Sequence, residues 1–439
     1  LELLRPLRVL PTKRITGEGL WNGQRVLAKL FVASGSARHW QRELAGVRAL
    51  AAASIPSPAV LASGTFAGGG RYLLTAFLPD AKSLADTLPS HFDTARPLLE
   101  AACERIGQLH TNGLVHDDPH PGNFLISSGM LLLIDGAAVQ SRTSPLPKRE
   151  AQDNLSKFFA QLPPDTPLEP LIAAYRAANP RYAMEPAGLF ALIAAHRHFR
   201  LDDYLRKTVR PCTLFDVRQN LRRFTAVARE DAAWLAPLLD DPDAAMASGV
   251  LLKRGNTATV ARVSFAGRSL VIKRYNIKNL AHALSRAWRP SRAWHAWREG
   301  HRLCFLGINT PKPRALIEER LGLLRRRAWL IADECSAPNL AEAFAPYADA
   351  SAPPPLEAAS LLHLIQLLYV WRISHGDFKA TNILLGADKA TVIDLDAMTQ
   401  HANPAAHTRA WRKDRARLLA NWPAESGLSR WLDSYLPKA

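Results

Sequence analysis

The sequence predicts an α+β chain that consists of two tandem copies of one unit. Its length of 439 residues exceeds what one compact core usually holds. Residues 116–126 (HDDPHPGNFLI) and 375–385 (HGDFKATNILL) repeat one motif, in which a His, an Asp and an Asn precede an apolar run. Strand-like and helix-like patterns surround both motifs in the same order, which favours a duplication over two unrelated domains.

The repeat keeps a constant register. Three pairs of polar residues are each 259 positions apart: Asp118 and Asp377, Asn123 and Asn382, and Asp135 and Asp394. In each copy the last Asp ends a second strand-like run, LLLID at 131–135 and TVID at 391–394. The polar residues are therefore predicted to lie on a loop that rigid strands hold in place.

Upstream of each motif lies an alternating strand that carries one lysine, Lys29 in the first copy and Lys273 in the second. A helical stretch with a glutamate follows, Glu43 in the first copy and Glu299 in the second. The breakers IPSP and NTPKP then end the helix, and a further apolar strand comes after them.

The boundary between the copies is predicted in residues 235–249, which combine Pro, Asp, Ser and Gly as linkers do. This predicts a first domain over residues 1–240 and a second over 241–439. The first copy has a helical region after its motif. The second has only 45 residues after Asp394, which predicts a shorter helical part.

The composition is that of a globular protein with an unusual charge. A formal net charge of +17 and a pI near 10.1 predict an anionic partner. The longest uncharged apolar run, residues 358–371, is too short to span a bilayer and is predicted to be a buried helix. The chain begins with Leu1 rather than Met, which leaves room for upstream residues or a removed leader.

The cysteines are widely spaced and form no CxxC pair, which fits neither a zinc site nor a disulfide framework and suits a reducing cytoplasm. They are Cys103, Cys212, Cys304 and Cys335.

The polar set matches what phosphoryl transfer from ATP requires. A strand lysine held by a helix carboxylate can hold the nucleotide phosphates, an Asp can accept the acceptor's proton, and an Asn and a further Asp can bind Mg²⁺. The predicted catalytic residues are Asp377 and Asp118. The predicted metal ligands are Asn382, Asp394, Asn123 and Asp135. The predicted phosphate-positioning pairs are Lys273 with Glu299 and Lys29 with Glu43.

With these residues in place, the sequence resembles the protein-kinase-like superfamily, and specifically the bacterial lipopolysaccharide kinase family that phosphorylates Kdo or heptose in the inner core. Residues 375–382 (HGDFKATN) look like that family's HGDLKxxN loop, and residues 251–263 look like its glycine-containing hairpin. The resemblance implies two tandem kinase-like domains, each with a small antiparallel β N-lobe and a mainly helical C-lobe, and ATP in the cleft between lobes. It also implies ATP contacts at Gly255 in the second copy and at Gly17 and Gly19 in the first.

The same resemblance implies ATP and Mg²⁺ as cofactors and lipopolysaccharide core, or its lipid-linked precursor, as the acceptor. The expected location is cytoplasmic, peripheral at the inner face of the cytoplasmic membrane. Neither motif is followed by Ala-Pro-Glu, which in protein kinases supports a peptide platform, and this favours a small acceptor.

Alternatives remain open. The chain could phosphorylate another small molecule or a protein, or one or both halves could be a pseudokinase scaffold in lipopolysaccharide assembly. Asp117 and Pro119 depart from the family pattern and make that scaffold reading most apt for the first half. His116 and His375 are expected to brace the loop through backbone contacts. Asp396 could be a second metal contact or a surface residue, and the sequence does not decide between these roles.

A basic segment at 273–302 is the predicted contact with an anionic membrane, because Trp beside Arg is typical of headgroup-level surfaces. The alternative is a solvated helix face with its tryptophans packed into the N-lobe. No nucleic-acid module is recognisable, so no nucleic-acid partner is expected. The segment contains Lys273, Arg274, Lys278, Arg286, Arg289, Arg292, Arg298 and Arg302 with Trp288, Trp294 and Trp297.

Overall fold

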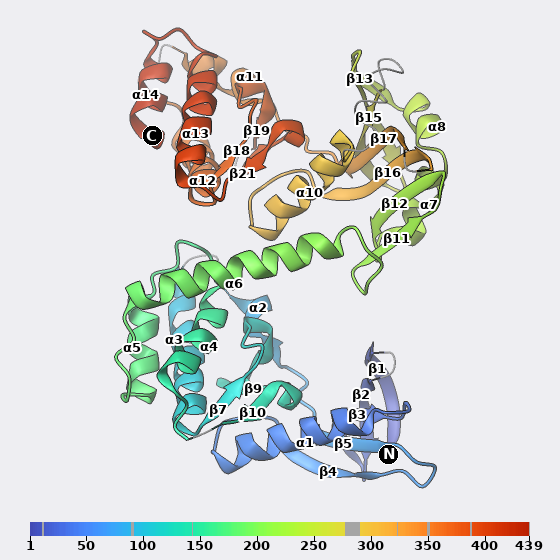
Figure 1. The fold of residues 1–439 in the computed structure, drawn as a ribbon, viewed down its shortest axis with the longest axis vertical. Coiled ribbons are helices and arrows are strands. Elements are labelled where there is room, and N and C mark those ends of the chain that lie inside the picture. The colour runs from blue at the N-terminus through green and yellow to red at the C-terminus, as the bar shows by residue number, and fades with distance from the viewer. Residues whose placement is uncertain are drawn as a thin grey trace. The chain divides into compact units, whose positions relative to one another are not determined.

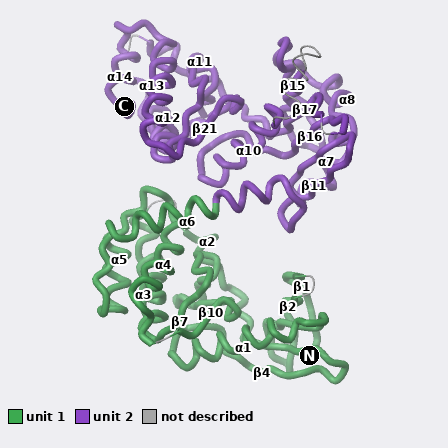
Figure 2. Tube along the Cα trace, viewed as in Figure 1, with its two compact units in different colours: residues 1–200 green, residues 201–439 purple. Residues whose placement is uncertain are grey.

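The chain folds into two compact units, residues 1–200 and residues 201–439 (Figure 2). The computed structural model describes residues 1–10, 13–88, 92–142, 144–276, 290–322, 324–348, 352–386 and 389–438. Antiparallel sheets and many helices make up both units, as an α+β kinase-like fold predicts (Figure 1).

The first unit opens with a five-stranded antiparallel sheet in the order β1-β2-β3-β5-β4. Because side chains alternate along β3, Val26 and Ala28 lie on one face of the sheet. Lys29 and Phe31 lie on the other face, which α1 covers. Lys29 therefore points toward the helix that carries Glu43. The elements are β1 (Glu2–Leu10), β2 (Arg14–Trp21), β3 (Gln24–Phe31), α1 (Ala37–Ala52), β4 (Val60–Thr65) and β5 (Arg71–Ala76).

The rest of the first unit is mainly helical and has one large core, to which Ile106, Phe124 and Phe158 contribute. The motif lies between short strands in this part. Its elements are β6 (Lys82–Ser83), α2 (Leu84–Thr87), α3 (Phe92–Thr111), β7 (Leu114–His116), η1 (Pro121–Asn123), β8 (Phe124–Ser127), β9 (Met130–Leu133), η2 (Gly136–Ala138), β10 (Val139–Ser141), α4 (Lys148–Phe159), α5 (Glu169–Ala178) and α6 (Pro186–Lys207).

The second unit contains a seven-stranded antiparallel sheet in the order β11-β12-β16-β17-β15-β14-β13. One face packs on Leu235 and Leu238 of α7, and the other packs on Trp297 of α10. The elements are β11 (Phe215–Gln219), β12 (Arg223–Ala228), α7 (Ala232–Asp240), α8 (Pro242–Ala247), β13 (Val250–Arg254), β14 (Ala258–Phe265), β15 (Arg268–Tyr275), α10 (Arg292–Phe305), β16 (Pro313–Leu321) and β17 (Leu324–Asp333).

The second unit also has a mainly helical part, and the shorter length expected for it stays a prediction. Residues 358–371 fall almost entirely in α12, whose Leu361, Ile365 and Leu368 are buried in its core. Among the described residues, no helix has the length and apolar character needed to cross a membrane. The elements are α11 (Leu340–Phe344), η3 (Ala345–Tyr347), α12 (Pro355–Val370), β18 (Ile373–Ser374), η4 (Ala380–Asn382), β19 (Ile383–Leu385), β20 (Ala390–Val392), η5 (Leu395–Ala397), β21 (Thr399–Gln400), α13 (Pro404–Leu419) and α14 (Gly427–Tyr435).

The boundary between the compact units lies within α6, earlier in the chain than the predicted 240/241. The cause is that β12 pairs with β16, so residues 215–228 extend the sheet of the second unit. The predicted linker at 235–249 is mostly the two helices α7 and α8, because Leu235 and Leu238 are buried against the sheet. The kinase-like character of both halves stays a prediction.

Gly46 lets α1 approach the segment that follows Asp135. A Cβ at Gly46 would lie 1.8 Å from the carbonyl oxygen of Gly136, whereas a Cβ at Gly188, also in a helix, would have 3.6 Å to its nearest neighbour. We expect Gly46→Ala to lower the free energy of unfolding by about 1–3 kcal/mol through overpacking. Gly188→Ala is the control and should keep or slightly raise it.

Chemical denaturation of both variants and the wild type measures this difference. Equal stability of Gly46→Ala and wild type would show that α1 is not held against residues 136–138.

Candidate functional site

Four of the predicted residues of the second unit line one cavity of about 590 Å³, whereas Asp377 and Glu299 are not among its lining residues. Gly255 and Lys273 line it from the sheet, and Asn382 and Asp394 line it from the helical part. Gly255 lies in the turn between β13 and β14, where its N–H donates to the carbonyl of Ala258 at 3.0 Å. The hairpin predicted at 251–263 is thus confirmed, and its glycine faces the same cavity as the polar loop.

The motif loop is fixed to the buried strands that follow it. Asn382 donates from its side chain to the backbone carbonyl of Asp377 at 2.9 Å and to its Oδ2 at 3.3 Å. The buried His375 shares a hydrogen bond with the carbonyl of Ile393 through Nε2 at 2.9 Å, which is the bracing contact expected from the sequence. These contacts hold Asp377 in a defined place beside the cavity.

Asp377 has two cationic neighbours. Lys379 Nζ lies 3.1 Å from one carboxylate oxygen, and Arg417 of α13 lies 2.9 Å from the other. The sequence showed Lys379 within the motif, but nothing in it linked Arg417, forty positions downstream, to this loop.

Asp414, one turn before Arg417, also holds the loop. Its carboxylate accepts from the backbone N–H groups of His375 at 2.6 Å and Gly376 at 3.0 Å. Burial raises the pKa of Asp414 despite these donors. Helix α13 therefore holds the loop at two points: Asp414 binds the loop's backbone, and Arg417 binds the side chain of Asp377.

Asp394 follows β20 with a left-handed backbone, φ +61°. Its Oδ1 accepts from Lys273 Nζ at 2.6 Å. Burial alone would raise the pKa of Asp394, but the charge and hydrogen bond of Lys273 outweigh it, so the pKa lies below its usual value.

The predicted ion pair of Lys273 with Glu299 is not present. Glu299 pairs instead with Arg302, one turn further along α10, at 2.8 Å. Lys273 is drawn to Asp394 and also to Asp396, 2.9 Å away. Glu299 pairs with Arg302 because Arg302 lies on the same helix face. Lys273 pairs with Asp394 and Asp396 because both carboxylates lie within reach of it.

Asp396 is neither a surface residue nor free for a metal in this structure. It accepts from Lys273, from the Tyr275 hydroxyl at 2.6 Å and from Arg292 at 2.5 Å. Burial, and then the charge of Asp396, raise the pKa of Tyr275 well above its usual value. No sequence pattern singled out Tyr275, so the sequence analysis missed this network.

The first unit repeats the geometry of the loop. Asn123 donates to the carbonyl of Asp118 at 2.9 Å, and His116 contacts the carbonyl of Ile134 at 3.1 Å. Asp135 has the same left-handed backbone as Asp394, φ +64°. The equal spacing seen in the sequence therefore corresponds to equal local structure.

The charges around the first site differ. The predicted pair of Lys29 with Glu43 is present, and Arg14 joins it by donating to Glu43 at 2.5 Å. Arg14 also lies 3.6 Å from Asp135. Asp118 is exposed and has His120 at 3.8 Å, where Asp377 has Lys379.

Gly17 and Gly19, for which ATP contacts are predicted, do not lie in a turn, and those contacts stay a prediction. Both lie inside β2, paired with β1 on one side and β3 on the other. A Cβ at Gly17 would lie 2.7 Å from the carbonyl of Arg5, and one at Gly19 would lie 2.6 Å from that of Glu2. These glycines allow the irregular strand β1 to approach, which is a structural role.

The basic segment is only partly described, since residues 277–289 lie outside the described residues. Trp297 is fully buried in the sheet–helix core, and the ring of Trp294 packs at a tilt against Phe224, with 4.8 Å between ring centres. These two tryptophans are therefore packed into the N-lobe and do not form the predicted headgroup surface.

The residues fit a magnesium ion shared with nucleotide phosphates. Such a site typically needs one or two carboxylates, with phosphates and waters supplying the remaining oxygens. Asp394 supplies a carboxylate, and Asn382, whose amide nitrogen is engaged with Asp377, keeps its amide oxygen for a ligand. Within the described residues, no group of three or more His, Cys, Asp and Glu side chains could hold a metal by itself.

Comparison with known proteins matches residues 247–426 to the lipopolysaccharide kinase (Kdo/WaaP) family. The match indicates a kinase and lies within the second unit. None of the curated proteins matches the chain. A solved structure titled "WaaP in complex with acyl carrier protein" is 21% identical, with a TM-score of 0.36, over 45% of this chain and 89% of that chain.

The lowered pKa of Asp394 predicts a pH-dependent contribution of Lys273 to stability. A carboxyl group with a lowered folded-state pKa stabilises the fold above its unfolded pKa, near 3.8, and this is lost as pH falls through the folded value. We expect Lys273→Met to lower the free energy of unfolding at neutral pH and to converge toward the wild type below pH 3.8.

Denaturant titrations at several pH values measure this difference, with Lys413→Met, an exposed lysine of α13, as the control. A gap between Lys273→Met and wild type that stays constant from neutral to acidic pH would contradict the assigned ion pair.

Proposed function

We propose, since residues 247–426 match the model of the lipopolysaccharide kinase (Kdo/WaaP) family, that the chain transfers the γ-phosphate of ATP to an inner-core sugar of lipopolysaccharide. The acceptor would be Kdo or heptose, and the reaction would depend on Mg²⁺. The observation that carries this proposal is the joint placement of Lys273, Asn382 and Asp394 on one cavity beside Asp377, inside the family-matched stretch.

The cavity suits a nucleotide by size and by lining. Its volume of about 590 Å³ is within the range of small-molecule sites. Val260, Leu330 and Leu384 supply apolar surface for a base, while Lys253 and Lys273 supply positive charge for phosphates. Lys273 would leave Asp394 for a phosphate oxygen, because a dianionic phosphate attracts it more strongly than one carboxylate.

Asn382 and Asp394 would hold the magnesium ion, which when bound supplies positive charge at the β and γ phosphates. Asp377 would hydrogen-bond the acceptor hydroxyl and accept its proton as that oxygen forms its bond to phosphorus. Lys379 and Arg417 keep the Asp377 carboxylate oriented, since each binds a different oxygen of it.

The proposed location is the cytoplasmic face of the inner membrane, where lipid-linked core sugars would be presented. The net charge of +17 supports an association with an anionic leaflet.

For the first unit we propose a scaffold or nucleotide-binding role as a second candidate. The specific observation is that Asp118 has His120 where Asp377 has Lys379, and that Asp117 is held by Gln140. An imidazole lacks the permanent charge that Lys379 offers to a transferring phosphate.

Phosphate transfer from labelled ATP to dephosphorylated lipopolysaccharide tests both candidates. We expect Asp377→Asn to lower turnover at least ~10²-fold, because it removes a contact to the reacting hydroxyl. Asp118→Asn should leave turnover near that of the wild type if the first unit is not catalytic. Asp433→Asn, an exposed residue of α14, is the matched control.

Full turnover in the double variant Asp118→Asn/Asp377→Asn would refute the catalytic assignment. Transfer halved in each single variant would instead assign one active site to each unit.

A further inference from the structure

Two neighbouring hairpin turns of the second unit carry exposed leucines. Leu221, in the turn between β11 and β12, is 73% exposed, and Leu321, at the end of β16, is 64% exposed. The turns are joined by backbone hydrogen bonds, from Arg320 to Arg222 at 2.7 Å and from Gly322 to Leu221 at 2.9 Å. The two leucines therefore belong to one end of the seven-stranded sheet.

The turn does not need a leucine for its own structure. Asn220 closes it: its side-chain oxygen accepts from the N–H groups of Arg222 and Arg223, both at 2.8 Å. Central turn positions usually hold Gly, Asn, Asp or Ser, and a fully hydrated leucine forgoes the burial that normally stabilises it. Exposed apolar residues gathered at one place are typical of an interaction surface.

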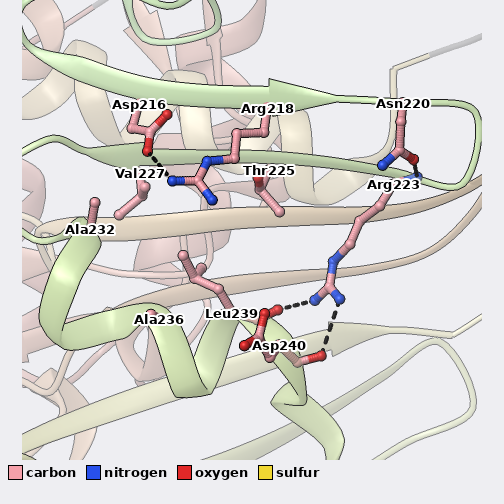
Figure 3. A pocket seen from close by; sticks show the side chains of 10 residues that line it. All are labelled: Asp216, Arg218, Asn220, Arg223, Thr225, Val227, Ala232, Ala236, Leu239 and Asp240. Carbon is pink, nitrogen blue, oxygen red and sulfur yellow. Dashed lines mark hydrogen bonds and ion pairs between the residues drawn. The ribbon is translucent and has the colours of Figure 1, made fainter.

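Arginines surround these leucines. Arg222 and Arg326 are exposed, and neither makes an ion pair with another described residue. Arg325 is held in place by the buried Glu318 and by the ring of Trp294, 5.1 Å from its guanidinium. Figure 3 shows that Arg218 and Arg223 are already engaged, the first with Asp216 and the second with carbonyls at the end of α7.

A hollow of about 320 Å³ lies between the two turns. Leu221, Arg320 and Arg325 are among its lining residues. The Nε of Arg320 is buried and has no hydrogen-bond acceptor among the described residues. An anionic group in this hollow would lie beside the guanidinium groups of Arg320 and Arg325, both of which also pair with Glu318.

We infer that this hairpin-tip surface, made of Leu221, Arg222, Leu321, Arg325 and Arg326, docks onto an anionic lipid leaflet. The leucines enter the boundary between headgroups and acyl chains, and the arginines bind the headgroup phosphates. Apolar side chains at the most exposed turn positions, with arginines beside them, complement such a leaflet. A nucleic acid would need no leucines there.

Sedimentation of the full chain with vesicles tests this surface, using phosphatidylcholine alone and phosphatidylcholine mixed with phosphatidylglycerol. We expect binding to the mixed vesicles, and about tenfold weaker binding for Leu221→Ser/Leu321→Ser and for Arg222→Gln/Arg326→Gln. Neither nucleotide nor acceptor is present, so the result does not depend on the proposed phosphate transfer.

The net charge of +17 gives every variant some attraction to anionic vesicles, so a matched control is needed. Leu356→Ser/Arg409→Gln makes one change of each kind in α12 and α13, where Leu356 is 74% exposed and Arg409 is also exposed. It should bind like the wild type. Unchanged melting temperatures in all variants would establish that each is folded.

Equal loss in the control and in the tip variants would overturn the inference, because binding would then follow total charge. Wild-type binding by Leu221→Ser/Leu321→Ser would also overturn it, since the surface would then serve an acidic polymer or protein. Equal binding of the wild type to both kinds of vesicle would remove the proposed role of the arginines.

Discussion

The structure of each site depends on how the motif loop is tied to the strands behind it. In the second unit Ile393 donates its backbone N–H to the carbonyl of Asn382 at 2.9 Å, while its own carbonyl meets His375. Ile393, the residue directly after β20, thus fixes both ends of the loop. Ile134 does the same in the first unit, with Asn123 at 2.9 Å and His116 at 3.1 Å. These contacts use the backbone of Ile393 or Ile134 and the ring of His375 or His116, so they hold the loop without using the carboxylates of Asp377 and Asp118.

The order of elements could be predicted because it follows from local patterns. The alternation in 25–31 and 270–275 gives β3 and β15 the same burial pattern, so each lysine faces the covering helix of its sheet. The shared spacing of residues 116–126 and 375–385 also predicted where the two polar loops lie. In contrast, β12 joins β16 across about ninety positions of sequence, and no local pattern selects that partner. The unit boundary was misplaced for this reason.

Side-chain partners were the hardest part to predict. No sequence pattern indicates that Glu299 pairs with Arg302 rather than with Lys273, since the pairing depends on distances between α10, β15 and the segment after β20. Glycine was also ambiguous. Gly17 and Gly19 had the composition of a phosphate-binding turn, but they serve the close approach of β1, and only the strand register distinguishes the two uses. Arg417 reaches Asp377 from a helix that the motif does not include.

The two sites share one electrostatic principle, although different residues carry it. In each unit a carboxylate that binds the strand lysine also binds an arginine: Asp396 has Arg292, and Glu43 has Arg14. A buried carboxylate left without a cation would cost several kcal/mol. The arginine removes that penalty, so the lysine can turn to an incoming phosphate while the carboxylate stays paired.

In the second unit Arg292 does not contact Asp394 in this structure, so the lysine would free that carboxylate for a cation that arrives with the phosphates. In the first unit Arg14 lies near Asp135 as well, and the corresponding carboxylate keeps a positive neighbour after the lysine moves. The same set of polar residues is therefore better arranged to receive a metal in the second unit than in the first.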